Sequence, residues 1–377
     1  MQVLASVVAV SANPMGTGLT YPEALLIGAL QGVTELFPVS SLGHSVLIPA
    51  LIGGKWATDL NVSSAESPYL AFVVGLHVAT AIALLVYFWR DWVRIITGFV
   101  TSLRHRRIRT ADERLAWMII LGTIPVGVAG LLLEHTFRTV LGRPMPAAIF
   151  LMINGVILYA AERMRRRVPV AVPGSGGGGG LESEVAPQSP AGPAVADRAS
   201  DIPIAATTQS AVIPQSASQA AVDSASDVIA AVTPRSALGQ AGADRASDER
   251  IARRSLGETT AVAAAQVAAL LPGISRSGVT MAAGLARGLS HEDAARFSFL
   301  LATPVILAAG VLKVPDLLGP LGDGIRPQVL VGSLASGVCA YLSVRFLTRY
   351  FETRTLTPFA IYCFAAGAAS MGWLILR

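Results

Sequence analysis

The sequence predicts an all-α polytopic membrane protein made of inverted-topology repeats, each a re-entrant helical hairpin followed by three transmembrane helices. Three observations predict this fold. Of the 377 residues, 53% are hydrophobic and only 14% are charged, whereas soluble domains carry about 25% charged residues. Six apolar runs are long enough to cross a bilayer. Two further apolar stretches are interrupted by proline, glycine and polar residues.

The six apolar runs cover residues 69–89, 115–133, 147–161, 294–312, 328–346 and 358–376. A transmembrane helix needs about 20 residues, and fewer where the bilayer thins. The interrupted stretches cover residues 21–52 and 259–289, with breaks at 38–44 and 272–278. Each half is too short to cross, so each stretch is predicted to enter and leave the membrane on one side. Non-helical backbone is tolerated at membrane depth only beside protein or water, so the two breaks are candidate walls of a site.

Arginine placement predicts the orientation. Segments 90–109, 163–167 and 345–354 are rich in arginine, and the positive-inside rule assigns such segments to the cytoplasm. The first hairpin then opens to the outside and the second to the inside. Inverted repeats with broken helices place a polar site at their interface. The formal net charge of +5 lies in these short clusters, without interleaved aromatic residues, so nucleic-acid binding is not expected.

The chain divides into four predicted regions. These are an N-terminal tail (1–19), a first membrane repeat (20–167), an insert (168–254) and a second membrane repeat (255–377). The insert opens with five consecutive glycines at 176–180 and repeats the sequence DRASD at 197–201 and 244–248. Such a polar composition cannot bury enough apolar surface to order the chain. We therefore expect a disordered cytoplasmic linker, with a modification or partner-binding site as the alternative.

The first break gathers polar groups. Gln31 and Glu35 are four residues apart and share one helix face, and Ser40, Ser41 and His44 follow them. An ionisable residue in an apolar helix indicates function by default, so we assign Glu35 and His44 to a site. For Ser40, capping of a broken helix is the preferred interpretation.

The second break contains Gly273, Ser275, Arg276, Ser277 and Thr280. A lone guanidinium inside a membrane needs a carboxylate partner or an anionic ligand. Arginine, hydroxyl groups and a helix beginning near Ser277 together favour phosphate binding. The alternative is a structural ion pair between Arg276 and Glu35, and the two interpretations are compatible.

Two segments, QGVTELFPVSSLGH and PGISRSGVT, resemble motifs of the undecaprenyl-diphosphate phosphatase family, also known as bacitracin-resistance proteins. The resemblance covers about residues 20–167 and 255–377. It implies inverted repeats and hydrolysis of a polyprenyl diphosphate lipid to the monophosphate and inorganic phosphate. It further implies a site on the outer face of the bacterial plasma membrane, and a divalent metal, Mg²⁺ or Ca²⁺. The product is a lipid carrier that is recycled for cell-wall synthesis, which confers bacitracin resistance.

The resemblance also implies roles for individual residues. Glu35 would be the metal-binding or acid–base carboxylate, Ser41 and His44 would act near the scissile phosphate, and Arg276 would hold the diphosphate. Ser275, Ser277 and Thr280 would donate hydrogen bonds to it, close to Gly273. Gln31 departs from the family pattern, because an amide stands where relatives have a carboxylate; its carbonyl oxygen could still face the cation. His77 stands where relatives often have glutamine, and it either lines the head-group pocket or packs between helices.

Two mechanisms and a rival function stay open at this stage. Either Ser41 attacks phosphorus with His44 as the base, or a metal-held water attacks and Glu35 or His44 takes its proton. A polyprenyl-phosphate flippase or secondary transporter would use the same inverted-repeat architecture. Whether the chain forms a homo-oligomer is also open.

Overall fold

The computed structural model describes residues 19–60, 68–165, 237–319 and 323–377. These residues belong to one compact unit and contain helices but no strand. The predicted tail up to residue 18 and the insert from 168 to 236 lie outside the described residues. Five helices are long and apolar enough to span a membrane, and a sixth span results if two helices bent by 84° are counted together. All six predicted apolar runs lie in these helices.

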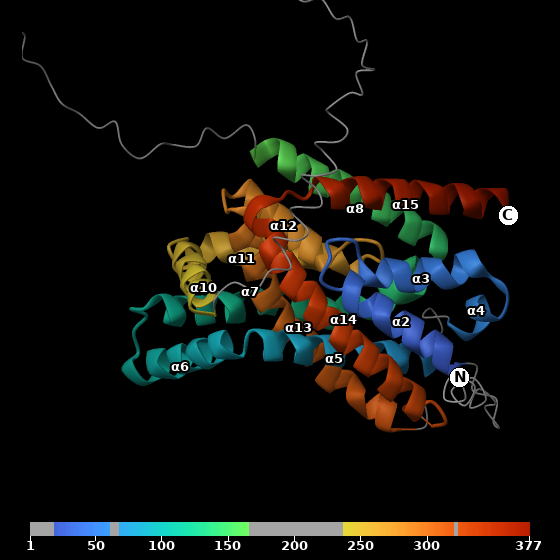
Figure 1. Ribbon diagram of the computed structural model, residues 1–377, viewed down its shortest axis with the longest axis horizontal. Helices are drawn as coiled ribbons and strands as arrows, with labels where there is room; N and C mark the ends of the chain where they lie inside the picture. The colour runs from blue at the N-terminus through green and yellow to red at the C-terminus, as the bar shows by residue number, and fades with distance from the viewer. Residues whose placement is uncertain (1–18, 61–67, 166–236, 320–322) are drawn as a thin grey trace, which may run out of the picture. The chain divides into compact units, whose positions relative to one another are not determined.

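The described part of the first half of the chain contains seven helices and one short π-helix (Figure 1). They are α2 (Tyr21–Thr34), α3 (Ser41–Ile52), α4 (Gly54–Asp59), α5 (Pro68–Tyr87), α6 (Trp89–His105), α7 (Ala111–Thr136), η1 (Phe137–Leu141) and α8 (Pro144–Arg165). The described part of the second half contains α10 (Ala237–Ala252), α11 (Leu256–Ala264), the 3-10 helix η2 (Ala265–Leu270), α12 (Arg276–Ala286), α13 (His291–Leu318), α14 (Arg326–Thr353) and α15 (Thr357–Leu376).

The two interrupted stretches begin in the same way. Before α2, the side chain of Thr20 accepts the backbone N–H of Glu23, whose carboxylate accepts the backbone N–H of Thr20 at 2.7 Å. Before α11, Ser255 and Glu258 make the same reciprocal pair of hydrogen bonds. This capping box satisfies two backbone donors that a helix start otherwise leaves unpaired.

Both breaks are shorter than the sequence predicted. Helix α3 already begins at Ser41, so His44 lies in a helix and not in the break. Helix α12 begins at Arg276, one residue before the predicted start at Ser277. The cause is the same at both places. Ser40 and Ser275 each cap the helix that follows them by accepting a backbone N–H, from Gly43 and Gly278 respectively.

Helices from the two halves of the chain pack against each other at small residues. Helix α14 lies along α2, where a side chain on Gly28 would collide with the backbone of Gly332. Helix α15 lies beside α8 (Figure 1), where a side chain on Gly155 would meet the carbonyl oxygen of Ala360. Close approach at small residues is the usual packing of helices in membranes. The two halves are therefore interleaved.

The two breaks meet tip to tip beside α8. A Cβ atom on Gly43 would lie 2.9 Å from the Cα atom of Gly273, and one on Gly273 would strike the backbone of α8. Asn154 of α8 is fully buried and joins both breaks. Its amide donates to the carbonyl oxygen of Pro38 at 3.0 Å, and its oxygen accepts the backbone N–H of Ser275 at 3.1 Å.

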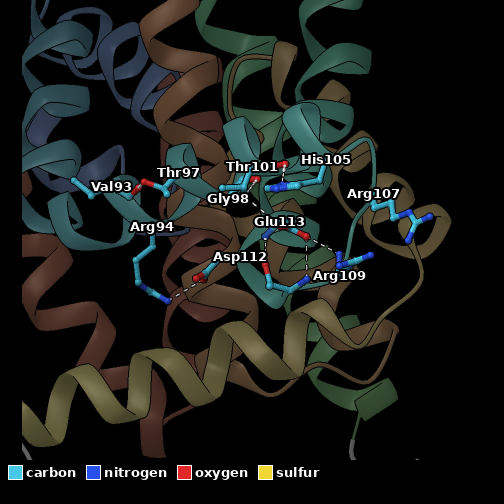
Figure 2. A pocket seen from close by; sticks show the side chains of 11 residues that line it. Val93, Arg94, Thr97, Gly98, Thr101, His105, Arg107, Arg109, Asp112 and Glu113 are labelled. Carbon is cyan, nitrogen blue, oxygen red and sulfur yellow. Dashed lines mark hydrogen bonds and ion pairs between the residues drawn. The ribbon is translucent and has the colours of Figure 1, made fainter.

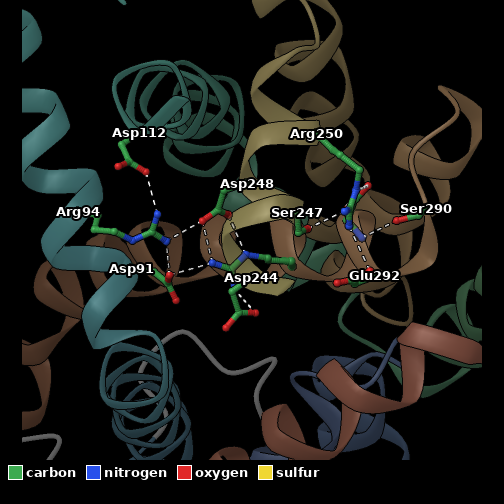
Figure 3. A network of polar contacts seen from close by, with 11 residues as sticks. Asp91, Arg94, Asp112, Asp244, Ser247, Asp248, Arg250, Ser290 and Glu292 are labelled. Carbon is green, nitrogen blue, oxygen red and sulfur yellow. Dashed lines mark hydrogen bonds and ion pairs between the residues drawn. The ribbon is translucent and has the colours of Figure 1, made fainter. Parts of the chain in front are cut away.

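The prediction that residues 168–254 are disordered is wrong for residues 237–252, which form α10. Acidic groups of this helix surround Arg296 of α13, which is only 3% exposed. Figure 3 shows two of these groups, Asp244 and Asp248, beside Asp91 and Arg94 of α6. Arg296 bonds both carboxylate oxygens of Asp248, at 2.7 and 2.9 Å, and lies 2.9 Å from Asp244 and from Asp91 of α6. Arg94 of α6 also contacts Asp248, at 2.8 Å. The partners of these aspartates come from distant helices, so composition alone could not reveal them.

We predict that Asn154→Leu destabilises the protein by about 1–3 kcal/mol. The change leaves the buried backbone N–H of Ser275 without its partner, and leaves the carbonyl oxygen of Pro38 with only the weak thiol donor of Cys363. Thermal unfolding in detergent measures this change. Ile153→Leu, at a half-exposed neighbouring position, serves as the control. An unchanged unfolding temperature in Asn154→Leu would show that the two breaks hold together without this amide.

We predict that the packing of α10 weakens as pH rises through about 6. Burial, together with the nearby acids Asp91, Asp248 and Glu292, raises the pKa of Asp244 to about 6 from its ordinary 3.8, against the opposing effect of Arg296. Packed α10 therefore binds a proton between these pH values that the released helix does not, so low pH favours the packed form. After correction for the intrinsic rise of the exchange rate with pH, the amide hydrogens of α10 should be more strongly protected from exchange at pH 5 than at pH 7.

Asp244→Asn should abolish this pH dependence, because the asparagine is neutral throughout. Glu249→Gln, which changes an exposed carboxylate of the same helix, should retain it. Equal pH dependence in the wild type and in Asp244→Asn would exclude Asp244 as its origin.

Candidate functional site

Glu35 lies at the centre of a cluster that four helices supply. It is the C-cap residue that directly follows α2, and its side chain is only 7% exposed. One carboxylate oxygen accepts hydrogen bonds from Gln31 at 2.9 Å and from the hydroxyl of Ser41 at 2.5 Å. The other accepts a hydrogen bond from Arg276. His77 of α5 lies 3.3 Å from the first oxygen. The predicted meeting of Glu35 and Arg276 is therefore present.

Arg276 is the first residue of α12, and its side chain is 14% exposed. Besides Glu35 it contacts the carbonyl oxygen of Ala302 in α13 at 3.4 Å. These two contacts use two of the five N–H donors of a guanidinium group. The structural ion pair thus leaves donors for an anionic ligand, and both interpretations of Arg276 fit the geometry.

His77 adds a second positive charge when its ring is protonated. Its Nδ1 donates to the carbonyl oxygen of Val73 at 2.8 Å, because a carbonyl can only accept. A favourable contact between Nε2 and the Glu35 carboxylate then requires a proton on Nε2 as well, which makes the ring an imidazolium. One carboxylate faces two cations, so the cluster has a surplus positive charge. His77 is also the most exposed of the three charged side chains, at 28%, and marks the side from which an anion can approach.

His44 does not join this cluster. Its Nδ1 donates to the carbonyl oxygen of Ser40 at 2.7 Å, so Nε2 is free to accept from the hydroxyl of Tyr362, also at 2.7 Å. Its side chain is buried, and its ring lies parallel to that of Tyr362. The sequence predicted that Glu35, His44 and Arg276 lie together. The structure shows direct contact between Glu35 and Arg276, whereas the hydrogen-bond partners of His44 are Ser40 and Tyr362.

The remaining residues of the second break make hydrogen bonds within the protein. Ser275 caps α12, Ser277 lies 3.3 Å from the carbonyl oxygen of Phe37, and Thr280 donates to the carbonyl oxygen of Arg276 at 2.8 Å. Gly273 has a positive φ of 109° and no room for a side chain against α8. These four residues build the break, and the three hydroxyl groups among them make no hydrogen bond to Glu35.

Gln31 carries an oxygen suited to a cation or a water. Its Oε1 is buried and has no hydrogen-bond partner among the described residues. Together with Glu35 it forms a pair of hard oxygen donors, and Mg²⁺ often takes one or two such ligands and completes its shell with substrate phosphates and water. Within the described residues, no group of three or more His, Cys, Asp or Glu side chains is arranged to hold a metal ion. The residues therefore fit a cation that arrives with a phosphate ligand.

Sequence reasoning missed Asn154 and Tyr362. Asn154 is a single amide in an apolar membrane helix, and polar residues in such helices are usually functional or structural anchors. That signal was available in the sequence. Tyr362 gave no comparable signal, because tyrosine is common near the ends of membrane helices. Its partner His44 lies 318 residues away along the chain.

Comparison with known proteins points to one family. A family model described as bacitracin resistance protein BacA matches residues 24–177 and 203–369. The undecaprenyl-diphosphatase of Mycolicibacterium paratuberculosis is 59% identical over 364 residues, which cover 96% of this chain and 100% of that protein. Undecaprenyl-diphosphatase 1 of Frankia casuarinae is 58% identical over 361 residues, covering 93% and 97% of the two chains. Undecaprenyl-diphosphatase 2 of Burkholderia lata is 36% identical over 354 residues, covering 94% and 96%. Because the family model matches both breaks and most of the chain, this protein belongs to the bacitracin resistance protein BacA family.

Proposed function

We propose that this chain is a membrane phosphatase that hydrolyses undecaprenyl diphosphate to the monophosphate and inorganic phosphate. The observation that supports this most directly is the buried cluster of Glu35, Arg276 and His77, whose surplus positive charge suits a diphosphate. The names of the relatives point to the same reaction. Recycling of this lipid carrier for cell-wall synthesis would account for bacitracin resistance.

The chain is a multi-pass membrane protein, and we propose that it resides in the bacterial plasma membrane as two inverted repeats. Paired breaks, matching capping boxes before α2 and α11, and interleaved packing of the two halves support the repeats. The arginine-rich segments support a cytoplasmic location for their loops. In this orientation the first hairpin, with Glu35, opens to the outer face.

The diphosphate would bind where Arg276 and His77 face Glu35. Phosphoryl transfer needs positive charge around the phosphate and an aligned nucleophile. The unused N–H groups of Arg276, the His77 ring and the N-terminus of α12 would supply the charge. The polyprenyl tail would stay among the acyl chains of the bilayer.

Ser41 is the better placed nucleophile, and Glu35 its better placed base. The Ser41 hydroxyl donates to Glu35 at 2.5 Å, whereas His44 is engaged by Tyr362. In this route the Ser41 oxygen bonds to the terminal phosphorus while Glu35 takes its proton. The bond to the bridging oxygen breaks, and polyprenyl phosphate leaves. Water then hydrolyses the phosphoserine and releases inorganic phosphate. The alternative with a water nucleophile would use Glu35 in the same role.

A divalent cation, Mg²⁺ or Ca²⁺, would be held by Glu35 and the free carbonyl oxygen of Gln31. When bound, such a cation neutralises charge on the diphosphate. Gln31 would also keep Glu35 oriented through its amide hydrogen bond at 2.9 Å.

We predict that Arg276→Ala and Glu35→Gln each lower phosphate release from undecaprenyl diphosphate by about 10²- to 10⁴-fold. The measurement uses purified protein in detergent with a titration of Mg²⁺ and Ca²⁺. Arg276→Lys keeps the charge but loses the planar pair of donors, so it should be intermediate. Arg287→Ala, at an exposed arginine beyond the opposite end of the same helix, should retain full activity.

Detergent also separates an enzyme from a transporter, because transport requires two compartments. Lipid movement across sealed vesicles without any phosphate release would favour the flippase or transporter and overturn the proposal.

We predict that Ser41→Ala lowers the rate by at least about 10²-fold, and that acid quenching of wild-type protein traps labelled phosphate on Ser41. Only a substrate labelled in the terminal phosphate should give this label. Ser40→Ala, which removes the neighbouring capping hydroxyl, should still accumulate it. Full activity of Ser41→Ala would instead establish a water nucleophile.

A further inference from the structure

Helix α6 leaves the membrane span that precedes it. Helices α5 and α6 are bent by 84° relative to each other at Phe88, and only together do they qualify as one broken span. With 17 residues, α6 is about 25 Å long. A helix that continued α5 across the bilayer would need little bend. The direction of α6 therefore needs another explanation.

One side of α6 is an exposed apolar stripe. It consists of Trp89, Val93, Ile96, Val100 and Leu103, each between 51% and 57% exposed. Their spacings of four and three residues place them on one helix face.

The opposite face of α6 packs on α7. Ile95 is buried there, Gly98 leaves no room for a side chain beside the backbone of Asp112, and Ser102 accepts a hydrogen bond from Trp117 at 3.0 Å. The helix is thus fixed by one face and presents an apolar surface with the other.

A basic cavity adjoins this stripe. It has a volume of ≈ 510 Å³ and lies between α6 and the start of α7, with Arg107 and Arg109 at one end (Figure 2). Its acidic residues already have partners. Asp112 binds Arg94 at 3.0 Å, and Glu113 accepts the backbone N–H groups of Arg109 and Thr110 at 2.5 and 3.0 Å.

The two arginines at the end of the cavity have no such partner. Arg107 and Arg109 are exposed, and their side chains form no ion pair with any described residue. Thr97 and Thr101, one turn apart, connect the basic end of the cavity with the apolar stripe.

We propose that α6 lies flat in the surface of the bilayer and that the adjoining cavity binds the phosphate of anionic phospholipids through Arg107 and Arg109. An apolar face buried in the interface with basic residues beside it is the pattern of interfacial helices. Trp89 fits this placement, because tryptophan is enriched at the membrane–water interface. The Arg90 guanidinium lies 5.3 Å from its ring centre. The occupant is a lipid surface and not a protein, because the span α5 itself delivers α6 to the membrane boundary.

The orientation of α6 can be tested by depth measurements on the full chain. Nitroxide labels are attached at Val93→Cys, Ile96→Cys, Val100→Cys and Leu103→Cys, one at a time, in a chain lacking Cys339 and Cys363. The protein is placed in nanodiscs of phosphatidylcholine and phosphatidylglycerol at three to one. Relative access of oxygen and a nickel complex reports the depth of each label.

We expect equal, shallow depths at all four positions. A helix that continues the crossing would change depth by about 15 Å over these ten residues. Such a gradient, or full exposure of all four labels to the nickel complex, would overturn the interfacial placement.

The lipid preference has its own test. Spin-labelled phosphatidylglycerol should associate with the protein more strongly than spin-labelled phosphatidylcholine. Arg107→Gln combined with Arg109→Gln should reduce this preference by up to about 25-fold, since each basic residue near an anionic surface contributes about a factor of five. Arg287→Gln combined with Arg326→Gln removes the same charge from exposed positions elsewhere and should leave the preference unchanged.

Glycerol phosphate distinguishes a lipid surface from a free phosphate. At equal concentration it should not displace the labelled lipid, because it lacks the acyl chains that contact the α6 stripe. Displacement by glycerol phosphate, or an unchanged preference in the Arg107/Arg109 double variant, would overturn the proposed site.

Discussion

The centre of this structure depends on one ion pair, between Glu35 at the end of α2 and Arg276 at the start of α12. A carboxylate or a guanidinium alone at membrane depth is costly, and removal of one partner from a buried pair typically costs about 3–5 kcal/mol. The pair can form only if the two interrupted helices end at the same place. This condition explains the close contact of Gly43 with Gly273 and the position of Asn154 between the breaks. The ion pair and the packing of the tips therefore require each other.

The same arrangement leaves the site ready for an anion. Glu35 accepts hydrogen bonds from Gln31 and Ser41 as well as from Arg276, so the carboxylate is held in one orientation before any ligand binds. His77 completes the cluster from α5, a helix outside both hairpins. The hydroxyl groups of Ser275, Ser277 and Thr280 are used to hold the second break together. In the proposed function, recognition of a phosphate would therefore rest on a few charged groups, and the neighbouring hydroxyl groups would keep those groups in place.

The sequence predicted the features that follow from charge in an apolar environment. Glu35 and Arg276 stand out in apolar stretches, and run length alone predicted the five helices that can span a membrane and the bent pair that can form a sixth span. The inverted arrangement of the repeats is a prediction that still stands untested.

The orientation of His44 could not be predicted, because Nε2 is engaged by Tyr362 from the last helix. Helix α10 was missed for a similar reason. Its aspartates look like linker residues until Arg296 and Arg94, from two other helices, are brought beside them. Local sequence shows which residues need a partner, whereas the choice of partner depends on the fold.

Helix α13 connects the two charged clusters of the molecule. Arg296 near its start is surrounded by aspartates of α6 and α10, and the carbonyl oxygen of Ala302, less than two turns later, contacts Arg276. A rigid helix of this length transmits a displacement of one end to the other. The contacts of α10 and α6 with Arg296 therefore fix the position of α13 along its own axis, and with it the position of the Ala302 carbonyl oxygen that contacts Arg276. If α6 is held at the bilayer surface, the position of α13 is fixed relative to that surface. The arginine-rich side of the protein then contributes to the geometry of the site by positioning α13, without contacting the substrate.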